Sequence, residues 1–543
     1  MEILSCEDLS FKYNGEEKPA LDGCSFSVNS GEIILLCGKS GSGKSTLLKL
    51  LKRELSPAGE KKGRIFLFGG EQDRLSDREG AEKIGFVMQN PDDQTVCDKV
   101  SAELCFGLES LGVPSGEILA RVGEMAGFFG IEPLYDRDVS TLSGGQKQLV
   151  NLCSVMVSGA RLLLLDEPTA QLDPVAAKDF LHILHRLNDE LGLTVIIAEH
   201  NPDDIFSSCD RVLYMEKGRT EFFGKPSKAA EYFSSHGLAE FLPAAAKIFS
   251  GISDSLPLDV RAAKLKLEKG FKPDMTVSDS ESPSGEIVLK AENLWQRYEK
   301  NEPDILKGVD ISVRKGECLA LLGSNGAGKS TLLKALCGAE KCYMGKITLF
   351  GKKLSSYKNG SLFRNNTAML PQDPYAMFAK ESVAEELREN ASEEQIKAVA
   401  GRLDIEELLE RHPYDLSGGE IQNCAFAKIL LSKPKLILLD ECTKGMDGFR
   451  RKELGEILGE LKGEGITLIL VTHDLEFAAK YCDRCALFFD GKIVSEDNSR
   501  RFFAKNNFYT TAAARSTKGF FADTVTPEQV RERLLAQRGA DDE

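Results

Sequence analysis

The sequence contains no apolar run that approaches the roughly 18 consecutive residues needed to cross a bilayer. Its first ten residues also lack the basic-then-apolar order of a secretory signal. The chain also lacks an excess of positive charge, since 84 acidic and 69 basic residues give a net charge of −15, and nucleic-acid binding needs a net basic face. These absences argue against a membrane-spanning chain, a secreted chain and a broad nucleic-acid surface, although they leave a local basic patch open. They predict a cytoplasmic protein.

Paired cysteine motifs are scarce too. The 14 cysteines are scattered, and most lie within apolar segments, as Cys37 and Cys318 do. In a cytoplasmic protein they are expected to be reduced, small core residues. Cys482 and Cys485 form one close pair, but no second pair completes four metal ligands. The sequence therefore favours a structural role for the cysteines over a metal site.

What the sequence does contain is an internal repeat. A length of 543 residues suggests three or four folding units at about 150 residues each. A glycine-rich loop, a Leu-Ser-Gly-Gly stretch and an apolar segment ending in Asp-Glu occur in the same order twice. They lie at residues 38–46, 142–146 and 162–167, then at 323–331, 416–420 and 436–441. The offset between copies shrinks from the loop to the Leu-Ser-Gly-Gly stretch, so the second copy has lost residues between them. We infer two homologous halves.

Residues 38–46 fit the phosphate-binding pattern G-x-x-x-x-G-K-[ST] between a predicted strand, 31–37, and a predicted helix, 45–55. Its glycines let backbone N–H groups wrap phosphates, Lys44 reaches the β and γ oxygens, and Ser45 binds Mg²⁺. The helix points its positive N-terminus at the same phosphates. Because the order of strand, loop and helix recurs in the second copy, a plain glycine-rich turn is disfavoured.

The ordered set of motifs, present twice, resembles the ATP-binding cassette (ABC) ATPases over nearly the whole chain. The resemblance implies an α/β fold: two tandem ABC-type P-loop NTPase domains, each with a RecA-like core, an antiparallel β subdomain and a helical subdomain. We expect the first domain at 1–224, a linker at 225–285, the second domain at 286–497 and a tail at 498–543. The linker should combine a helical segment, 239–267, with a flexible Ser/Pro/acidic tether, 272–285, and the tail should start a short helix at Pro527.

The resemblance also assigns roles to single residues. Glu167 and Glu441 would be catalytic by polarising the attacking water, and His200 and His473 would contact the γ-phosphate and these glutamates. Mg²⁺ would be held in each half by a serine, a glutamine and an aspartate: Ser45, Gln89 and Asp166, then Ser330, Gln372 and Asp440.

An aromatic residue stacks on adenine in this family, and Tyr13 and Tyr298 stand equally far before their loops. Packing of these rings into the core is the alternative. The full expected set of ATP-binding residues is Tyr13, Gly38, Ser40, Gly41, Gly43, Lys44, Ser45, Thr46, Ser143, Gly144, Gly145, Tyr298, Gly323, Asn325, Gly326, Gly328, Lys329, Ser330, Thr331, Ser417, Gly418 and Gly419.

The resemblance implies that each Leu-Ser-Gly-Gly stretch faces the γ-phosphate bound by the other half, and that Asp173 and Asp447 lie where the halves cross. The chain departs from the family at three places. Leu149 and Asn423 stand where an arginine is common, and Cys442 stands where proline is usual. These departures put the partner contact and fine geometry in doubt more than the chemistry.

Residues 89–94 (QNPDDQ) and 106–109 (FGLE) resemble the ATPases of energy-coupling factor (ECF) transporters, although Asn-Pro-Asp-Asp is also simply a turn sequence. The second copy, at 372–377, lacks the second glutamine. This resemblance implies an ATPase, with ATP and Mg²⁺ as cofactors, that energises import of a vitamin, vitamin precursor or trace metal ion. Its partners would be a transmembrane coupling subunit and a substrate-binding membrane protein, with no nucleic acid. The chain would be peripheral at the cytoplasmic face of the membrane, touching it through partners only.

Two alternatives stay open. A soluble tandem ABC protein could act on ribosomes or DNA, but such members usually carry a long charged helical linker or zinc cysteine clusters, and neither is visible. A fused sugar-import ATPase looks much alike, although that group often has a degraded second site, whereas both copies here keep glutamate and histidine. The transported substrate cannot be deduced, because nothing in such an ATPase touches it.

Overall fold

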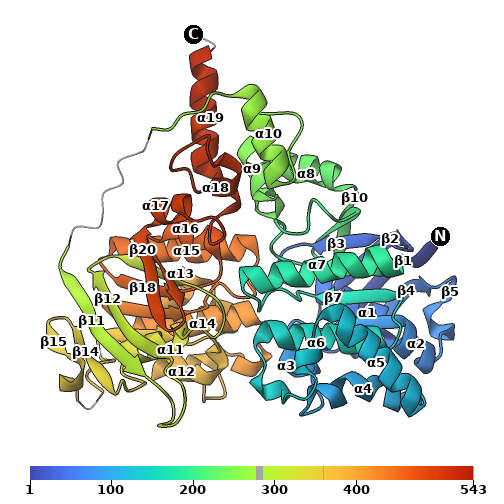
Figure 1. The fold of residues 1–543 in the computed structure, drawn as a ribbon, viewed down its shortest axis with the longest axis horizontal. Helices are drawn as coiled ribbons and strands as arrows, with labels where there is room; N and C mark the ends of the chain where they lie inside the picture. The colour runs from blue at the N-terminus through green and yellow to red at the C-terminus, as the bar shows by residue number, and fades with distance from the viewer. Residues whose placement is uncertain (277–284, 359, 390, 542–543) are drawn as a thin grey trace. The chain divides into compact units, whose positions relative to one another are not determined.

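The computed structural model describes residues 1–276, 285–358, 360–389 and 391–541. The chain forms two compact units, Met1–Ala263 and Lys264–Glu543, and each carries one copy of the motifs. Each unit contains one antiparallel sheet and one mostly parallel sheet with helices beside it (Figure 1). The tandem ABC fold expected from the sequence is therefore confirmed.

The mostly parallel sheet of unit 1 has the strand order β10-β9-β3-β8-β7-β6. Its inner strands β3, β7 and β8 are buried at every position, as expected for apolar strands covered on both faces. Only β10 runs antiparallel to its neighbour. The bounds are β3 Ile33–Cys37, β6 Ile84–Val87, β7 Leu162–Asp166, β8 Thr194–Ala198, β9 Arg211–Glu216 and β10 Arg219–Gly224.

The antiparallel sheet of unit 1 packs its apolar face on helix α1, and Leu4, Leu36 and Leu47 share one core. The sheet consists of β1 Glu2–Tyr13, β2 Leu21–Asn29, β4 Gly59–Leu67 and β5 Gly70–Glu71. The α-helices are α1 Lys44–Leu51, α2 Asp77–Lys83, α3 Pro91–Gln94, α4 Val100–Ser110, α5 Ser115–Phe129, α6 Gly144–Val157, α7 Pro174–Leu191, α8 Pro226–Ser235 and α9 Ala244–Phe249. Helices α4, α5 and α6 pack together as the helical subdomain.

Unit 2 repeats this architecture with sheets β12-β11-β14-β15 and β16-β17-β18-β13-β19-β20. The strands are β11 Ile287–Gln296, β12 Leu306–Arg314, β13 Cys318–Leu322, β14 Met344–Leu349, β15 Lys352–Lys353, β16 Thr367–Leu370, β17 Leu436–Asp440, β18 Thr467–Val471, β19 Arg484–Phe489 and β20 Lys492–Asn498. The helices are α11 Lys329–Leu336, α12 Val383–Arg388, α13 Glu393–Leu403, α14 Gly418–Leu431, α15 Gly448–Gly463, α16 Leu475–Tyr481, α17 Ser499–Lys505, α18 Ala512–Thr517 and α19 Pro527–Asp541.

The residues missing from the second copy fall in its helical subdomain. Helices α12 and α13 have 6 and 11 residues, whereas their counterparts α4 and α5 have 11 and 15. The nucleotide-binding core is therefore the better preserved part of the repeat.

The segment after β10 folds onto unit 1. Phe233 of α8 and Phe241 are buried against Tyr214 of β9, with ring centroids 5.3 Å from the tyrosine in both cases. Helix α10, Val260–Gly270, follows and contains the boundary between the two units. Of the tether expected at 272–285, residues 277–284 lie outside the described residues.

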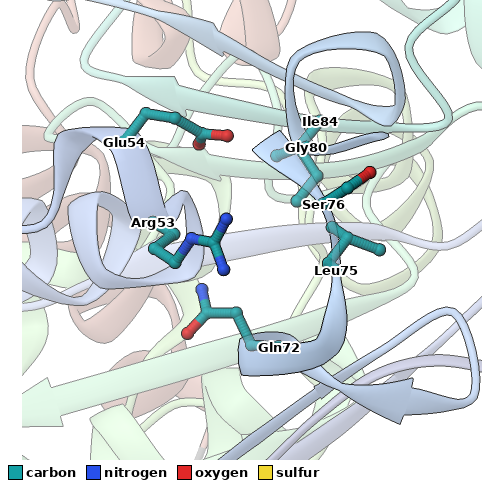
Figure 2. A pocket seen from close by; sticks show the side chains of 7 residues that line it. All are labelled: Arg53, Glu54, Gln72, Leu75, Ser76, Gly80 and Ile84. Carbon is teal, nitrogen blue, oxygen red and sulfur yellow. The ribbon is translucent and has the colours of Figure 1, made fainter. Parts of the chain in front are cut away.

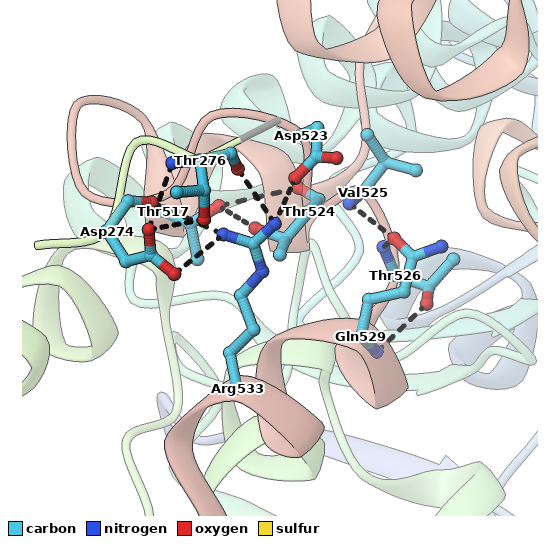
Figure 3. A network of polar contacts seen from close by, with 9 residues as sticks. All are labelled: Asp274, Thr276, Thr517, Asp523, Thr524, Val525, Thr526, Gln529 and Arg533. Atoms are coloured by element: carbon cyan, nitrogen blue, oxygen red, sulfur yellow. Dashed lines mark hydrogen bonds and ion pairs between the residues drawn. The ribbon is translucent and has the colours of Figure 1, made fainter. Parts of the chain in front are cut away.

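Helix α19 confirms the helix predicted at Pro527, and it holds residues 272–276 (Figure 3). One Nη atom of Arg533 donates to Asp523 Oδ1 at 2.5 Å and to the carbonyl oxygen of Thr276 at 3.0 Å. The side chain of Asp523 is 6% exposed, and this arginine compensates its charge. We call the contacts between α19 and residues 272–276 the tail clasp.

A second side chain of α19 completes the tail clasp. Gln537 accepts a hydrogen bond from the backbone N–H of Lys272 and donates one to its carbonyl oxygen, at 3.1 and 2.8 Å. Asp274 also forms a parallel β-bridge with Phe521. The two ends of the unit 2 sequence are therefore joined. Among the described residues, no helix is long and apolar enough to cross a membrane.

Candidate active site

The carboxyl ends of the parallel strands bring the predicted site residues to one edge of each sheet. In unit 1, β3 leads into the phosphate-binding loop, β7 ends at Asp166, β8 precedes His200, and β6 precedes Gln89. In unit 2, β13, β17, β18 and β16 do the same for the second copy. Residues far apart in sequence thus meet because the strands share direction and register.

The phosphate-binding loop of unit 1 needs glycine where backbone passes close to backbone. Gly43 has φ +97°, and a Cβ atom there would lie 2.6 Å from the carbonyl oxygen of Ala20. A Cβ atom on Gly38 would lie 2.3 Å from the carbonyl oxygen of Met215. Glycine is therefore needed at both positions, and the loop forms a cradle lined by backbone atoms.

The loop lysine of each unit is buried and turned into this cradle. Lys44 Nζ donates to the carbonyl oxygens of Gly38 and Lys39 at 2.8 and 3.2 Å. Lys329 makes the matching bonds, at 2.9 and 2.8 Å, to the first two residues of its loop. A buried ammonium group surrounded by loop backbone suits a polyphosphate.

A serine hydroxyl and an aspartate carboxylate meet beside each cradle. Ser45 Oγ donates to Asp166 Oδ1 at 2.9 Å, and Ser330 Oγ donates to Asp440 Oδ1 at the same distance. Burial raises the pKa of both aspartates above the ordinary value, with the serine hydrogen bond opposing and the adjacent glutamate adding to the rise. Oxygen ligands of this kind fit Mg²⁺, whose charge would favour the ionised carboxylate.

Glu167 is held by two of the predicted site residues. His200 Nε2 lies 2.5 Å from Glu167 Oε1, and Gln89 Nε2 donates to Glu167 Oε2 at 2.7 Å. In unit 2, His473 Nε2 lies 2.8 Å from Glu441 Oε1. Burial acts to raise the pKa of Glu441, but the hydrogen bond and charge of His473 outweigh it and lower that pKa. Glu441 is thus kept ionised, as a group that polarises water must be.

Both glutamates adopt left-handed backbone conformations, with φ +50° at Glu167 and +54° at Glu441. Such strain costs about 1–3 kcal/mol and persists only where neighbours enforce it. The N–H of Glu167 donates to the carbonyl oxygen of Ala198 at 3.0 Å, and that of Glu441 to Val471 at 2.9 Å. The neighbouring strand therefore fixes the turn at which each carboxylate leaves the sheet.

The two tyrosines proposed for adenine stacking lie beside the start of the loop helix. Tyr13 and Tyr298 each share a hydrogen bond between their hydroxyl and that of Thr46 or Thr331, at 2.9 and 3.1 Å. Tyr298 is 56% exposed. This placement leaves ring surface accessible next to the cradle.

The Leu-Ser-Gly-Gly stretches form the N-termini of α6 and α14. Ser143 and Gln146 make a capping box, as do Ser417 and Glu420, which satisfies backbone N–H groups at each helix start. Both serines are exposed. A Cβ atom on Gly418 would meet nothing within 4 Å, so the surface there is open.

The loop that follows Gln89 is anchored from both sides. Gln94 accepts from the N–H of Met88 at 2.9 Å, and Asn151 of α6 donates to the carbonyl oxygen of Pro91 at 2.9 Å. Asp92 pairs with Lys147 at 2.5 Å. The loop is therefore bonded directly to α6, the helix that begins at the Leu-Ser-Gly-Gly stretch and that we call the signature helix of unit 1, as α14 is of unit 2.

The matching loop of unit 2 uses other contacts. Tyr375 Oη donates to the carbonyl oxygen of Leu416 at 2.9 Å, and Lys428 donates to that of Met377 at 2.6 Å. Asn423 donates to the carbonyl oxygen of Leu403 at 3.3 Å, and the backbone of Cys442 accepts a hydrogen bond from Gln422. The departures noted in the sequence are thus accommodated by local hydrogen bonds.

Sequence reasoning missed Glu199, which precedes His200 and is 6% exposed. Its Oε1 atom accepts hydrogen bonds from Thr169 Oγ1 and N–H, at 2.7 and 3.1 Å. Burial raises the pKa of Glu199 to about 8, the hydrogen bonds from Thr169 oppose this, and the charge of Glu167 adds to it. An acidic residue at the end of an otherwise apolar strand was the available signal.

A small pocket elsewhere in unit 1 contains none of the predicted site residues (Figure 2). Gln72 forms part of its wall and donates to the carbonyl oxygens of Leu50 and Leu51, at 2.8 and 3.1 Å. These hydrogen bonds satisfy carbonyl groups in the last turn of α1, so burial of Gln72 in the pocket wall has a structural reason.

Comparison with known proteins agrees with the fold and with its two copies. The sequence pattern of the family described as ABC transporter matches residues 21–170 and 306–444. A Bacillus cereus protein named as an ABC transporter ATP-binding protein is 42% identical over 536 residues, 97% of each chain. The chain therefore belongs to the ABC transporter family and is an ATPase of its ATP-binding class.

Two further relatives cover the full tandem. A Bacillus subtilis protein named as the HMP/thiamine import ATP-binding protein YkoD is 31% identical across 98% of both chains. The archaeal ribosome recycling factor aABCE1, solved with the stalk protein aP1, matches with a TM-score of 0.59 and 22% identity, covering 92% of this chain and 91% of that one. This second likeness concerns the fold alone.

Proposed function

We propose that the chain is the ATP-hydrolysing subunit of an ECF-type importer of a vitamin, vitamin precursor or trace metal ion. The observation that carries the proposal is the likeness to a full-length tandem relative named for HMP/thiamine import. The stretch 89–94 supports it, because its capped turn lies between the site glutamine and the signature helix. The fold-level likeness to a ribosome recycling factor does not favour a soluble role.

In the proposed mechanism, Glu167 and Glu441 polarise the attacking water. His200 and His473 hold these carboxylates in position and donate toward the γ-phosphate. The loop residues bind the phosphates, with Lys44 and Lys329 as the buried cations. Tyr13 and Tyr298 stack on adenine.

The donor set at each site fits Mg²⁺. Ser45, Asp166 and Gln89 would hold it in the first site, and Ser330, Asp440 and Gln372 in the second. Bound Mg²⁺ supplies neutralisation of phosphate charge. The residues of the chain orient the phosphates and water around it.

We further propose that both ATP sites are composite. Ser417, Gly418 and Gly419 complete the site of Lys44, and Ser143, Gly144 and Gly145 complete the site of Lys329. The exposed positions of both serines support this pairing, because a capped helix N-terminus at the surface suits a phosphate delivered by another part of the chain.

The partners would be a transmembrane coupling subunit and a substrate-binding membrane protein, which keep the ATPase at the cytoplasmic membrane face. The test is purification of the native protein from detergent-solubilised membranes. Co-purification with at least one multi-spanning protein is expected. Recovery wholly in the soluble fraction, bound to ribosomes or DNA, would overturn the importer assignment.

A further inference from the structure

The turn that follows the catalytic glutamate is secured differently in the two sites. In unit 1 the carboxyl group of Glu199 accepts two hydrogen bonds from Thr169, two residues after Glu167. In unit 2 the corresponding pair is Thr443 and Thr472, whose hydroxyl groups lie 3.0 Å apart. One site therefore places a buried acid where the other places a hydroxyl.

The contact in unit 1 lies next to the Glu167–His200 pair. Glu199 directly precedes His200 on the exit of β8, and Thr169 lies on the exit of β7. Between these exits, the N–H of Glu167 already bonds to Ala198 at 3.0 Å, and its carboxylate to His200 at 2.5 Å. The Thr169 bonds add a third link beyond the strained residue, so both sides of Glu167 are fixed.

Burial raises the pKa of Glu199 and so favours its neutral form, which is compatible with a second carboxylate nearby. Both donors of Thr169 point to Oε1, and the backbone N–H of His200 also donates to the carboxyl group, so Glu199 links the turn after Glu167 to the residue that contacts it. A neutral carboxyl group supplies acceptor capacity without placing a second full negative charge beside Glu167.

We propose that Glu199 is a positioning residue of the first ATP site, which acts through Thr169 to hold Glu167 against His200. The second site achieves the same link with two hydroxyl groups, so the two sites are not equivalent in what supports their catalytic glutamates. The inference rests on the proposed catalytic role of Glu167, and it adds a residue that acts on the first site alone.

The test compares Glu199→Ala, Glu199→Gln and Thr169→Val in the full-length chain. Glu199→Ala leaves two buried donors of Thr169 without their acceptor, so kcat should fall about tenfold, while the Kd for MgATP stays within about twofold. Glu199→Gln should retain most turnover, because its amide oxygen can accept the same two bonds. The Glu199→Ala/Thr169→Val double variant should lose no more than the worse single variant.

Each variant is measured in the parent and in a Glu441→Gln background. If the two sites hydrolyse ATP independently, turnover in the Glu441→Gln background comes from the first site alone. If hydrolysis at the two sites is coupled, a defect in the first site lowers turnover in the parent background as well. Glu103→Ala is the matched control, because Glu103 is also buried and accepts two N–H bonds, from Val96 and Cys97 at 2.9 and 2.8 Å. It should lower Tm without changing kcat of the folded protein.

Parent-like kcat in Glu199→Ala, or losses that add in the double variant, would overturn the inference. So would a loss in Glu199→Gln as large as that in Glu199→Ala, since a positioning role through an acceptor predicts rescue. Glu167→Gln is measured alongside in both backgrounds. No loss of turnover in either background would contradict the proposed role of Glu167, whereas a loss with Glu167→Gln but none with Glu199→Ala would contradict only this inference.

Discussion

Each glutamate proposed as catalytic has an unfavourable backbone conformation that its neighbours enforce. The left-handed φ values at Glu167 and Glu441 recur in both units although the flanking residues differ. Recurrence of the same strain in two divergent copies indicates that the geometry matters for the position of the carboxylate. The strained residue follows directly after a buried strand, β7 or β17, at the edge of the sheet where the predicted site residues lie.

We expect Glu167→Gln and Glu441→Gln to bind MgATP while the double variant loses most turnover, by about 100-fold or more. Glutamine keeps the shape and the contact with histidine but cannot take the negative charge that polarises water. Phosphate release gives turnover, and equilibrium nucleotide binding gives Kd. Turnover close to that of the parent protein in the double variant would remove both glutamates from the mechanism.

At this scale the sequence predicts residues that belong to one continuous motif. Lys44, Ser45 and Asp166 could be predicted because each belongs to a short motif, the phosphate-binding loop or the apolar strand ending in Asp-Glu, whose residue types indicate their function. Glu199 could not, because its partner Thr169 is 30 residues away and meets it only through the register of β7 and β8. Pairings that depend on strand register are invisible in a single sequence.

At the scale of elements, the signature helix α14 offers a clean test of composite sites. Space around Gly418 is open, so Gly418→Trp should fold normally yet obstruct whatever phosphate approaches that helix. We expect it to impair nucleotide trapping at the site of Lys44 by about tenfold or more and to spare the site of Lys329. Site-resolved trapping with photoreactive ATP measures both.

Gly144→Trp on α6 is the reciprocal variant and should impair the site of Lys329 instead. Its Cβ atom would come no nearer than 3.9 Å to the carbonyl oxygen of Gln171, so it too should be tolerated. Gly419 is unsuitable, because a Cβ atom there would lie 1.5 Å from Arg450. The opposite pairing in this experiment would exclude the composite arrangement.

The loop containing α3 should carry the contact with a membrane partner. Asp92→Lys and Asp93→Lys reverse charge there, and the first change also replaces the ion pair of Asp92 with Lys147 by a repulsion between two positive charges. We expect at least fivefold weaker co-purification with the membrane protein and unchanged ATP binding, on the order of 1 kcal/mol of lost contact. The matched control is Asp77→Lys on α2, which breaks the ion pair that Asp77 forms with Arg53. Equal loss in the control would refute a specific role.

Element types were largely predictable, whereas their length and packing were not. The helical pattern at 101–138 resolves into α4 and α5, and the strands before both loops formed as expected. The tail was expected to contain one short helix, but α17 and α18 precede it and Phe502 and Phe503 are buried. Both helices have N-cap residues, Asn498 and Thr511, but with 7 and 6 residues they are too short to show a clear helical period, and tertiary packing stabilises them.

At the scale of the whole molecule, the tail clasp should contribute to the stability of unit 2. Arg533→Ala removes a cation that pairs with the buried carboxylate of Asp523, so the free energy of unfolding should fall by about 2 kcal/mol. Glu528→Ala on the same helix removes an exposed pair with Lys480 and should cost about 0.5 kcal/mol or less. Denaturant unfolding of the full chain compares the two, and equal effects would show that the clasp is not stabilising.

The tail clasp also sets an order of events while the chain is being synthesised. Every element of unit 1 leaves the ribosome before unit 2 is complete, so the first unit can finish folding early. Residues 272–276 also emerge early, but the helix that holds them, α19, is made after all other elements of its unit. The first backbone segment of unit 2 must therefore wait for the last helix before its hydrogen bonds are satisfied. In a nascent second unit, the tail clasp therefore cannot form until translation has passed residue 537.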